Sequence, residues 1–457
     1  MRFTPRSPSH SDSEYCPLFG TDGIRGRVGQ YPITPEACLQ IAWVAGSVVR
    51  KNGGRNVLIG KDTRVSGYML ESVLEAGFIA SGLDVSLLGV MPTPAVAFLT
   101  KSMKADLGVA ISASHNPFQD NGFKFFDYAG MKLSDETESH IEKLMQSQLE
   151  TENADALGKA TRPGYASRRY VDFCKQSVNG TLDVKGLRIV LDCAHGATYA
   201  IAPVVFSELG AEVLSIGASP DGRNINLECG TTDTRGLIKE VVERRADLGI
   251  AFDGDGDRIA MVDASGRLLD GDHILYCLAK AGQRANRDFG GVVGTVMTNN
   301  GLEIALKKLG VPFVRADVGD RHVQSKMTEL GWRLGGESSG HIMCHENTTT
   351  GDGIISALQV LASCQANDWS LSDIVEDLTL HPQVLVNVDV DNSSKVAVCE
   401  AIDGAIAAIN PAIRDRLRIV IRPSGTEPVV RVMVEGEDPQ LVDEIAYQCA
   451  HAIGDPR

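Results

Sequence analysis

The 457-residue chain has no apolar run that approaches the length of a membrane span, and its first fifteen residues lack the apolar core of a secretory signal. Its ten cysteines include no C-x-x-C pair and no spacing typical of a zinc site. These absences predict a cytoplasmic protein whose cysteines stay reduced and carry no chemistry. Positive charge is also in deficit, because the formal net charge is -15. Nucleic acid and membranes are therefore not expected as partners, and any anionic ligand needs a local cluster of Arg or Lys.

Nucleotide-binding motifs are missing as well. Gly60-Lys61 would end a Walker loop, but Arg55 stands where that loop needs its first glycine. No G-x-G-x-x-G opens a helix either. These absences argue against an ATP-driven kinase and against a dinucleotide-dependent dehydrogenase. Two glycine-containing segments therefore have no nucleotide-binding role. They are GKDTR at residues 60–64 and the turn at residues 19–26, which carries Arg25.

What is present indicates a globular protein of several domains, since 43% hydrophobic residues can bury a core and 457 residues exceed what one core usually holds. Three stretches repeat one plan, in which an apolar strand leads through a helix to a second strand and a polar turn. The paired strand segments are 81–90 with 105–112, 209–218 with 246–253, and 309–320 with 332–341. Strands that alternate with helices predict α/β domains whose ligands bind beyond the carboxyl ends of the strands.

The expected fold is therefore three similar α/β domains with mixed sheets around a central cleft, followed by a smaller C-terminal α+β domain. A flexible N-terminal extension is expected to precede them. The expected boundaries are 1–15 for the extension, 16–163, 164–265 and 266–378 for the three α/β domains, and 379–457 for the last domain.

The densest chemical signal is the run Asp253-Gly-Asp255-Gly-Asp257-Arg258, directly after an apolar strand. Three carboxylates on alternating residues, separated by flexible glycines, can direct oxygens onto one hard cation. A calcium EF-hand loop would need glycine and glutamate where Arg258 and Ala264 stand, so that interpretation fails. Mg²⁺ is the expected ion, because it commonly combines a few carboxylates with phosphate oxygens.

The matching loop of the first repeat reads Ser112-Ala-Ser114-His115-Asn-Pro117. A serine in such a loop more often makes a turn or caps a helix. Beside a metal site, however, a phosphorylated serine is a phosphate donor. Ser114 is therefore predicted as the phosphate carrier, and its phosphate as a fourth ligand of the cation.

Two further loops suit a sugar phosphate. The third repeat ends in GESSGH, residues 336–341, which offers Glu337 and hydroxyls to sugar hydroxyl groups. The last domain contains RPSGTEP, residues 422–428, with Arg431 beyond it. Guanidinium groups, hydroxyls and a glycine turn with free amides are suited to binding a phosphate.

Taken together, these four loops resemble the α-D-phosphohexomutase superfamily in order and over the chain from Phe19 to the C-terminal helix. Within that superfamily, five further segments are similar to the bacterial branch that acts on glucosamine phosphates. Their sequences are FGTDGIRG, SASHNPFQDNGFKFF, PDGRNIN (220–226), VVGTVMTNNG (292–301) and TTTGDGI (348–354).

The resemblance implies roles residue by residue. Ser114 would be the phosphoserine, and its phosphate would hold Mg²⁺ with Asp253, Asp255 and Asp257. The residues implied to assist proton and phosphoryl transfer are His115, Lys124, Arg258 and Arg25. The residues implied to bind the sugar are Glu337, Ser339 and His341. Those implied to bind the phosphate that is not reacting are Arg422, Ser424, Gly425, Thr426 and Arg431.

The implied activity is the interconversion of glucosamine 6-phosphate and glucosamine 1-phosphate through a 1,6-bisphosphate, toward UDP-N-acetylglucosamine. The implied partners are the hexosamine phosphate, the bisphosphate and a second copy of the chain in a homodimer. Two alternatives remain: a phosphomannomutase or phosphoglucomutase with the same machinery, and a sugar-phosphate sensor without catalysis. A sensor has no need of a nucleophile beside a metal, which weighs against it.

Overall fold

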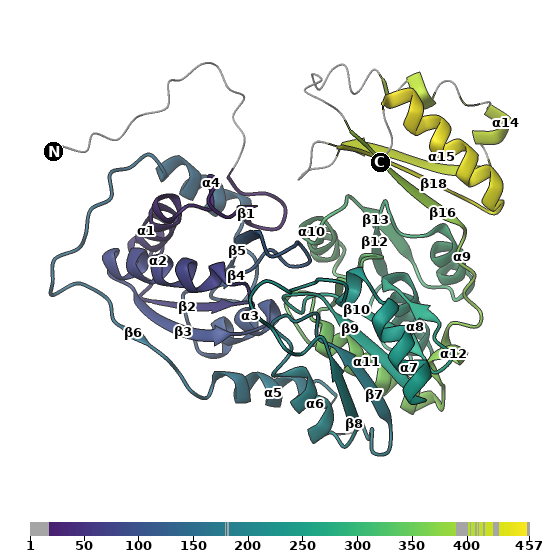
Figure 1. Cartoon of the computed structure of the whole chain (residues 1–457), viewed down its shortest axis with the longest axis horizontal. Coiled ribbons are helices and arrows are strands. Elements are labelled where there is room, and N and C mark those ends of the chain that lie inside the picture. Colours follow the sequence, from purple (N-terminus) through teal and green to yellow (C-terminus); the bar gives the residue numbers. More distant parts are fainter. Residues whose placement is uncertain are drawn as a thin grey trace.

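The computed structural model describes residues 18–178, 180, 182–389, 401–402, 404–406, 409, 411–414, 416–423 and 429–454, and it shows four units, each built on its own sheet (Figure 1). The extension predicted over residues 1–15 lies outside the described residues. The predicted class is confirmed: three α/β units with mixed sheets precede a smaller C-terminal unit. None of the helices in the described ranges is long and apolar enough to cross a membrane.

The first unit has a six-stranded sheet in the order β1-β5-β4-β2-β3-β6. Its strands β2, β3, β4 and β6 are parallel, β5 runs antiparallel to β4, and β1 pairs antiparallel with β5 at the edge. Its elements are β1 (Ile24–Arg27), α1 (Pro35–Lys51), β2 (Asn56–Lys61), α2 (Ser66–Ala80), β3 (Asp84–Val90), α3 (Thr93–Ser102), β4 (Leu107–Ile111), β5 (Asp120–Asp127), α4 (Asp135–Leu144) and β6 (Ala160–Thr161).

The second unit has a five-stranded sheet in the order β11-β10-β9-β7-β8. Strand β7 is parallel to β8 and β9, and β10 returns antiparallel to β9. Its elements are α5 (Ala166–Gln176), β7 (Arg188–Asp192), α6 (Ala202–Glu208), β8 (Glu212–Ile216), the 3-10 helix η1 (Gly230–Thr232), α7 (Arg235–Arg244), β9 (Leu248–Phe252), β10 (Ile259–Asp263) and β11 (Leu268–Leu269).

The third unit has a four-stranded sheet in the order β13-β12-β14-β15, in which only β15 is antiparallel. Its elements are α8 (Gly271–Arg284), β12 (Val292–Thr295), α9 (Asn300–Lys308), β13 (Phe313–Ala316), α10 (Asp320–Leu330), β14 (Leu334–Gly336), β15 (Ile342–Cys344), α11 (Gly353–Asn367) and α12 (Leu371–Ile374).

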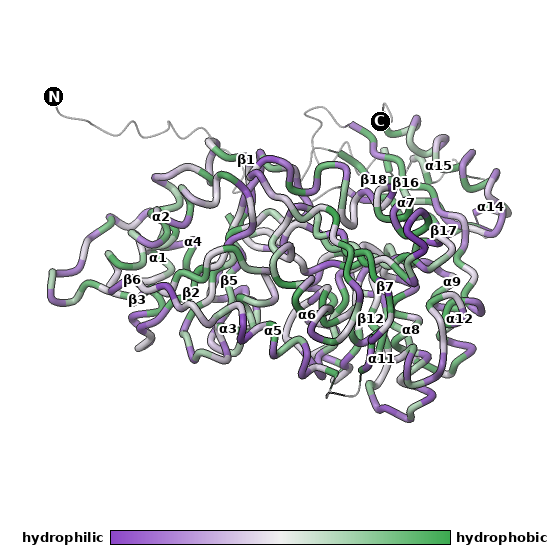
Figure 2. Tube along the Cα trace, turned by 60° about the horizontal axis from the view of Figure 1, so that its bottom comes forward, coloured by the Kyte–Doolittle hydropathy of each residue, from purple (hydrophilic) through white to green (hydrophobic). Residues whose placement is uncertain are grey.

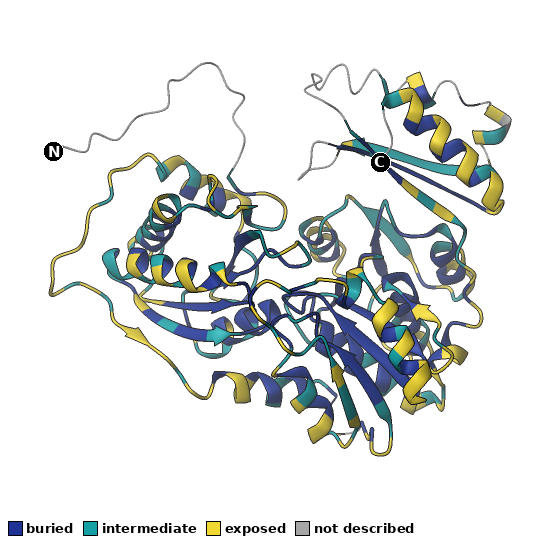
Figure 3. Cartoon of the chain, in the orientation of Figure 1, coloured by how far each residue is buried: buried dark blue, intermediate teal, exposed yellow. Residues whose placement is uncertain are grey.

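The predicted repeat is visible in the strand orders. In each sheet the third parallel strand in sequence has an antiparallel strand beside it. The corresponding strand orders are β5-β4-β2-β3, β10-β9-β7-β8 and β15-β14-β12-β13. The similar segments ADLGVA and ADLGIA contribute β4 and β9, which are buried along their whole length (Figure 3). Because β4, β9 and β14 are equivalent strands, the loops that follow them lie at equivalent edges of the three sheets.

The fourth unit is an antiparallel sheet in the order β16-β18-β17, covered by one long helix. Its described elements are β16 (Gln383–Asp389), α14 (Pro411–Arg414), β17 (Leu417–Pro423), β18 (Val429–Gly436) and α15 (Pro439–Ile453). In Figure 1 this unit stands above the third unit at the upper right.

Burial separates the fourth unit from the other three. The largest hydrophobic cluster joins the first three units, with Leu99 of α3, Tyr170 of α5 and Ile354 of α11 among its members. The fourth unit has a cluster of its own, which includes Val432 and Ile445. In Figure 2 strands such as β7 are largely hydrophobic, whereas surface helices such as α7 carry hydrophilic stretches. Units one to three therefore share a core that the fourth does not enter.

Candidate active site

The loop after β4 places Ser114 in contact with the second unit. Ser114 has a positive φ of 50° and is 1% exposed. Its Oγ donates a hydrogen bond to Asp253 Oδ2 at 2.6 Å and lies 3.3 Å from His115 Nδ1. The left-handed backbone is uncommon for a residue with a side chain, so the surrounding contacts must hold it in place.

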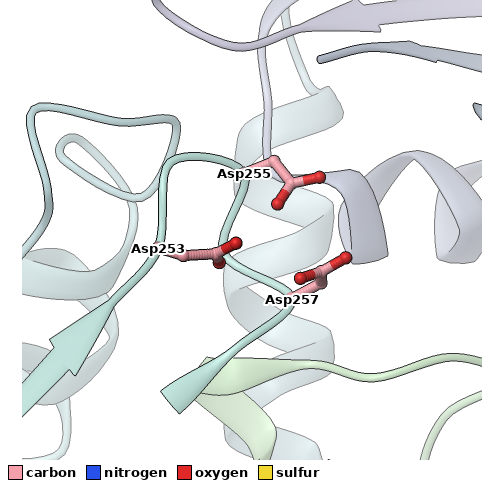
Figure 4. Close-up of side chains that lie close together, drawn as sticks. All are labelled: Asp253, Asp255 and Asp257. Carbon is pink, nitrogen blue, oxygen red and sulfur yellow. The ribbon is translucent and has the colours of Figure 1, made fainter. Parts of the chain in front are cut away.

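The loop between β9 and β10 brings three carboxylates together. Asp253, Asp255 and Asp257 are all buried, and each offers an oxygen that lies within 4.8 Å of the others' (Figure 4). Glycine makes the approach of the serine loop possible, because a Cβ at Gly254 would lie 2.6 Å from the carbonyl oxygen of Ser114. The loop with the three aspartates, the predicted cation site, thus packs directly against Ser114, the predicted phosphate carrier.

The bonding of these carboxylates leaves room for a cation. Lys124 Nζ, from β5, lies 2.7 Å from Asp257 Oδ2 and 3.0 Å from Asp255 Oδ2. The other oxygen, Oδ1, of each of these aspartates is buried and has no hydrogen-bond partner among the described residues. Burial and the neighbouring aspartates raise the pKa of Asp253 well above its ordinary value. A hard cation at these oxygens would satisfy them and relieve that repulsion, so the residues fit a metal ion.

Six charged side chains from all three α/β units form a closed ring of alternating charge, which includes Asp257 of the carboxylate loop. Within it, Lys132 Nζ lies 2.7 Å from Asp22 Oδ1 and 2.5 Å from Asp320 Oδ2. His341 lies 3.6 Å from both Asp257 and Asp320. In order, the ring consists of Asp22, Lys124, Asp257, His341, Asp320 and Lys132.

The ring sets the charge state of its basic members. Burial alone would lower the pKa of His341, but Asp257, Asp320 and Glu337 raise it to about 9. Burial likewise opposes the charge of Lys124, and Asp22, Asp255 and Asp257 outweigh it, so the pKa of Lys124 is held well above its ordinary value. Both side chains are therefore cations at neutral pH.

His115 differs from His341 and Lys124 because its surroundings lower its pKa. Burial, with the charges of Arg258 and Arg25, lowers the pKa of His115 to about 3. Arg25 also donates a hydrogen bond to the Ala113 carbonyl at 3.3 Å and pairs with Asp22. Arg258 is fixed by its backbone, whose N–H donates to Asp253 Oδ1 at 3.1 Å. A neutral imidazole thus lies beside the Ser114 hydroxyl, within reach of the charges of two guanidinium groups.

The third loop joins the same region from β14. Glu337 is buried, and its Oε1 accepts a hydrogen bond from the Gly319 N–H at 3.0 Å. Gly340 has a φ of +90°, and a Cβ there would lie 2.0 Å from the Ile259 carbonyl oxygen, which follows the acidic loop. Ser339 is exposed beside it. Glu337, Ser339 and His341 therefore lie on a loop packed against the carboxylate loop.

The predicted phosphate loop is described in part. Arg422 of β17 and Arg431 of β18 are directly opposite partners in the sheet. Burial and the charge of Arg431 lower the pKa of Arg422, against the raising effect of Glu337. Ser424, Gly425 and Thr426 lie outside the described residues. The structure therefore brings together two of the residues predicted to bind phosphate, Arg422 and Arg431.

Sequence reasoning missed several residues that the structure places at the site. Asp22 was visible in the turn that carries Arg25, and Asp62 and Arg64 in GKDTR, but no pattern gave them a role. Lys132 and Asp320 are single charged residues outside any motif. Only their contact across 188 positions of the chain reveals them.

Comparison with known proteins agrees with the fold. Models of the phosphoglucomutase/phosphomannomutase alpha/beta/alpha domains I, II and III match residues 17–152, 168–266 and 270–380, and the model of the C-terminal domain matches residues 385–452. The chain therefore belongs to the phosphoglucomutase/phosphomannomutase family, whose members are phosphohexomutases.

Similar curated proteins narrow the branch. A phosphoglucosamine mutase of Edwardsiella ictaluri is 54% identical over 435 residues, which cover 95% of this chain and 98% of that protein. A phosphoglucosamine mutase of Vibrio atlanticus is 52% identical over 441 residues, which cover 96% of this chain and 99% of that protein. The predicted resemblance to this branch is thereby confirmed, and the chain is a phosphohexomutase, which is an isomerase.

Solved structures share the fold at lower identity. A phosphoglucomutase/phosphomannomutase family protein of Burkholderia thailandensis has a TM-score of 0.79 at 23% identity and covers 94% of this chain and 96% of its own. An N-acetylphosphoglucosamine mutase of Aspergillus fumigatus, in complex with GlcNAc-6P and magnesium, has a TM-score of 0.65 at 19% identity, with 95% of each chain covered.

Proposed function

We propose that this protein interconverts glucosamine 6-phosphate and glucosamine 1-phosphate through a phosphorylated Ser114 and a 1,6-bisphosphate, on the way to UDP-N-acetylglucosamine. The observation that carries the proposal is the 2.6 Å contact between Ser114 Oγ and Asp253, which sets a buried hydroxyl beside three carboxylates. The names of the full-length relatives support the amino sugar as substrate.

Mg²⁺ is the proposed cation, with Asp253, Asp255, Asp257 and the phosphate on Ser114 as its ligands. The buried Oδ1 atoms of Asp255 and Asp257, which accept no hydrogen bond from a described residue, support this set, and so does the magnesium named with the Aspergillus fumigatus enzyme. When bound, the ion supplies positive charge that stabilises the phosphoryl group in flight.

In the first half-reaction a sugar hydroxyl oxygen bonds to phosphorus as the bond from Ser114 Oγ to phosphorus breaks, and the proton of that hydroxyl ends on Ser114 Oγ. We assign this proton transfer to His115, whose Nδ1 lies 3.3 Å from Ser114 Oγ. Arg258, Arg25 and Lys124 surround the transferring group and offset its charge. The bisphosphate then returns its other phosphate to Ser114.

The sugar and its second phosphate are bound by the remaining loops. Glu337, Ser339 and His341 present a carboxylate, a hydroxyl and a cation to the sugar hydroxyls. Arg422 and Arg431 are directly opposite partners on neighbouring strands, so both guanidinium groups can bind one anion. We assign the non-reacting phosphate to this pair, together with Ser424, Gly425 and Thr426.

The bisphosphate has to turn around between the half-reactions, so the distal site must accept either end of the sugar. A cytoplasmic location and a homodimer stay predictions beside this mechanism.

The test is turnover of the purified protein with a trace of bisphosphate, measured on glucosamine, mannose and glucose phosphates. Glucosamine phosphate should be the best substrate, and chelation should abolish activity until Mg²⁺ is restored. Ser114→Ala should lose activity by several orders of magnitude and lose the phosphoryl adduct in intact-mass analysis. Ser147→Ala, at an exposed serine, is the matched control. Near-normal turnover by the Ser114 variant would sink the proposal, and equal rates on mannose phosphate would shift it to a phosphomannomutase.

A further inference from the structure

The backbone of Ser114 is held by two side chains that the proposed mechanism does not use. Arg64, in the GKDTR segment after β2, is 0% exposed. Its Nη2 donates hydrogen bonds to the carbonyl oxygens of Ser114 at 2.9 Å and Asn116 at 2.8 Å. Asn226, in the PDGRNIN segment of the second unit, donates from Nδ2 to the same two oxygens at 2.9 and 3.1 Å. Two donors from different units therefore share one pair of acceptors.

The opposite end of the Ser114 backbone is fixed through Arg64 as well. Arg64 Nε donates to Asp62 Oδ2 at 2.8 Å, and the same oxygen accepts a hydrogen bond from Ser112 Oγ at 2.6 Å. Ser112 Oγ in turn accepts the Ser114 N–H at 2.9 Å. Both the N–H and the carbonyl of Ser114 are thus bonded, which accounts for the persistence of its left-handed conformation.

Asn226 differs from Arg64 in coming from the unit that carries the carboxylates. Its own φ is +59°, and its backbone N–H is bonded to the Ala194 carbonyl at 2.9 Å. A Cβ added at Gly254, inside the carboxylate loop, would lie 2.8 Å from Asn226 Nδ2. The amide therefore lies against the carboxylate loop at Gly254 while it holds the serine loop by two hydrogen bonds.

We infer that Asn226, with Arg64 as its partner, is a positioning residue that sets Ser114 at its distance from the three aspartates. This inference rests on the proposed function, because the distance matters only if Ser114 carries the phosphate. Since the substrate turns around between half-reactions, Ser114 has to keep the same position in both. A misplacement of about 1 Å can cost about a hundredfold in rate, so a clamp on the backbone of this residue has a direct consequence for turnover.

The test compares Asn226→Ala with Asn224→Ala, because the bonds of the Asn224 side chain to described residues stay within its own turn, at Asp221 and Ser219. Asn226→Ala should lower kcat roughly tenfold to a hundredfold, with KM and Tm close to those of the wild type. Transfer of the phosphoryl group from Ser114 should slow equally with the 1-phosphate and the 6-phosphate as acceptor. Mn²⁺ binding to the unphosphorylated protein should be unchanged, because the carboxylates are untouched.

Hydrogen exchange gives a readout that does not depend on activity. In Asn226→Ala the amides of residues 114–120 should exchange faster, while those of residues 253–258 keep their wild-type rates. Unchanged exchange together with unchanged kcat would overturn the inference, and so would a fall in Mn²⁺ affinity as large as the fall in kcat. Failure of the proposed function is recognised separately, because the wild-type protein would then show no phosphoserine and no turnover.

Discussion

Lys132 offers the sharpest test of how the three α/β units are held together. Its ammonium group pairs with Asp22 of the first unit and Asp320 of the third, and its side chain is 9% exposed. Lys132→Met would leave Asp320 with His341 as its remaining ring partner. Removal of one partner from a buried pair costs about 3 kcal/mol or more.

The size of the expected Tm shift follows from the size of the cooperative unit. An unfolding entropy of about 2.1 cal/mol/K per residue over roughly 360 residues converts 3 kcal/mol into a fall of about 4 °C in Tm. Differential scanning calorimetry or a melting curve followed by circular dichroism measures it. Asp320→Asn should cost less in the Lys132→Met background than in the wild type, because the pair is already broken.

Lys326→Met is the matched control. Lys326 pairs with Glu329 at a distance of 2.9 Å, but the two side chains are 33% and 63% exposed. Such a surface pair contributes about 0–1 kcal/mol, so its removal should shift Tm by about 1 °C or less. If Lys132→Met lowers Tm no more than this control does, the ring of alternating charge does not hold the units together, and the reasoning above is refuted.

Two further predictions concern the distal arginines and a buried acid. Arg422→Ala should lower kcat/KM roughly tenfold to a hundredfold through loss of a charge-assisted contact, whereas hydrolysis of the phosphoenzyme by water should change much less; an equal fall in both rates would remove Arg422 from the phosphate site. Burial raises the pKa of Asp272 to about 8, so the folded protein keeps a proton that the unfolded chain loses near pH 4. Stability should therefore fall as pH rises from about 4 to about 8, by up to about 1.4 kcal/mol per unit, and Asp272→Asn should flatten that slope in melting curves at pH 6 and 8; an unchanged slope contradicts it.

The sequence was sufficient to predict the strands and loops whose signal is local. The segments that became β4 and β9 are short apolar runs followed at once by polar turns, and the carboxylate loop has its three aspartates on alternating residues. Such patterns are set by burial of a strand and by the geometry of a turn, both of which depend on neighbours in the chain. The predicted grouping of Ser114 with the aspartates followed from the repeat.

The ring of alternating charge, and the contacts of Arg64 and Asn226 with the Ser114 carbonyl, could not be predicted in this way. Asn226 and Ser114 are 112 positions apart, and Lys132 and Asp320 are 188 positions apart. Lys and Asn are most often surface residues, so the sequence does not show which of them will contact another unit. These contacts exist because the three sheets present their equivalent edges to one place, which is a property of packing and not of any segment.

The separate core of the fourth unit has a consequence for the turn of the bisphosphate. Its described contacts with the third unit include hydrogen bonds from Arg418 to the carbonyl oxygens of Val296 and Thr298, at 2.6 and 2.7 Å. Bonds of this kind can be exchanged for bonds to water at a small net cost, whereas a shared apolar core cannot. A shift of the fourth unit would therefore carry Arg422, a proposed phosphate-binding residue, away from the first three units while the cluster that joins those units stays intact. Ser114 and its carboxylates keep their distance during such a movement, because the clamp on Ser114 lies within the first two units.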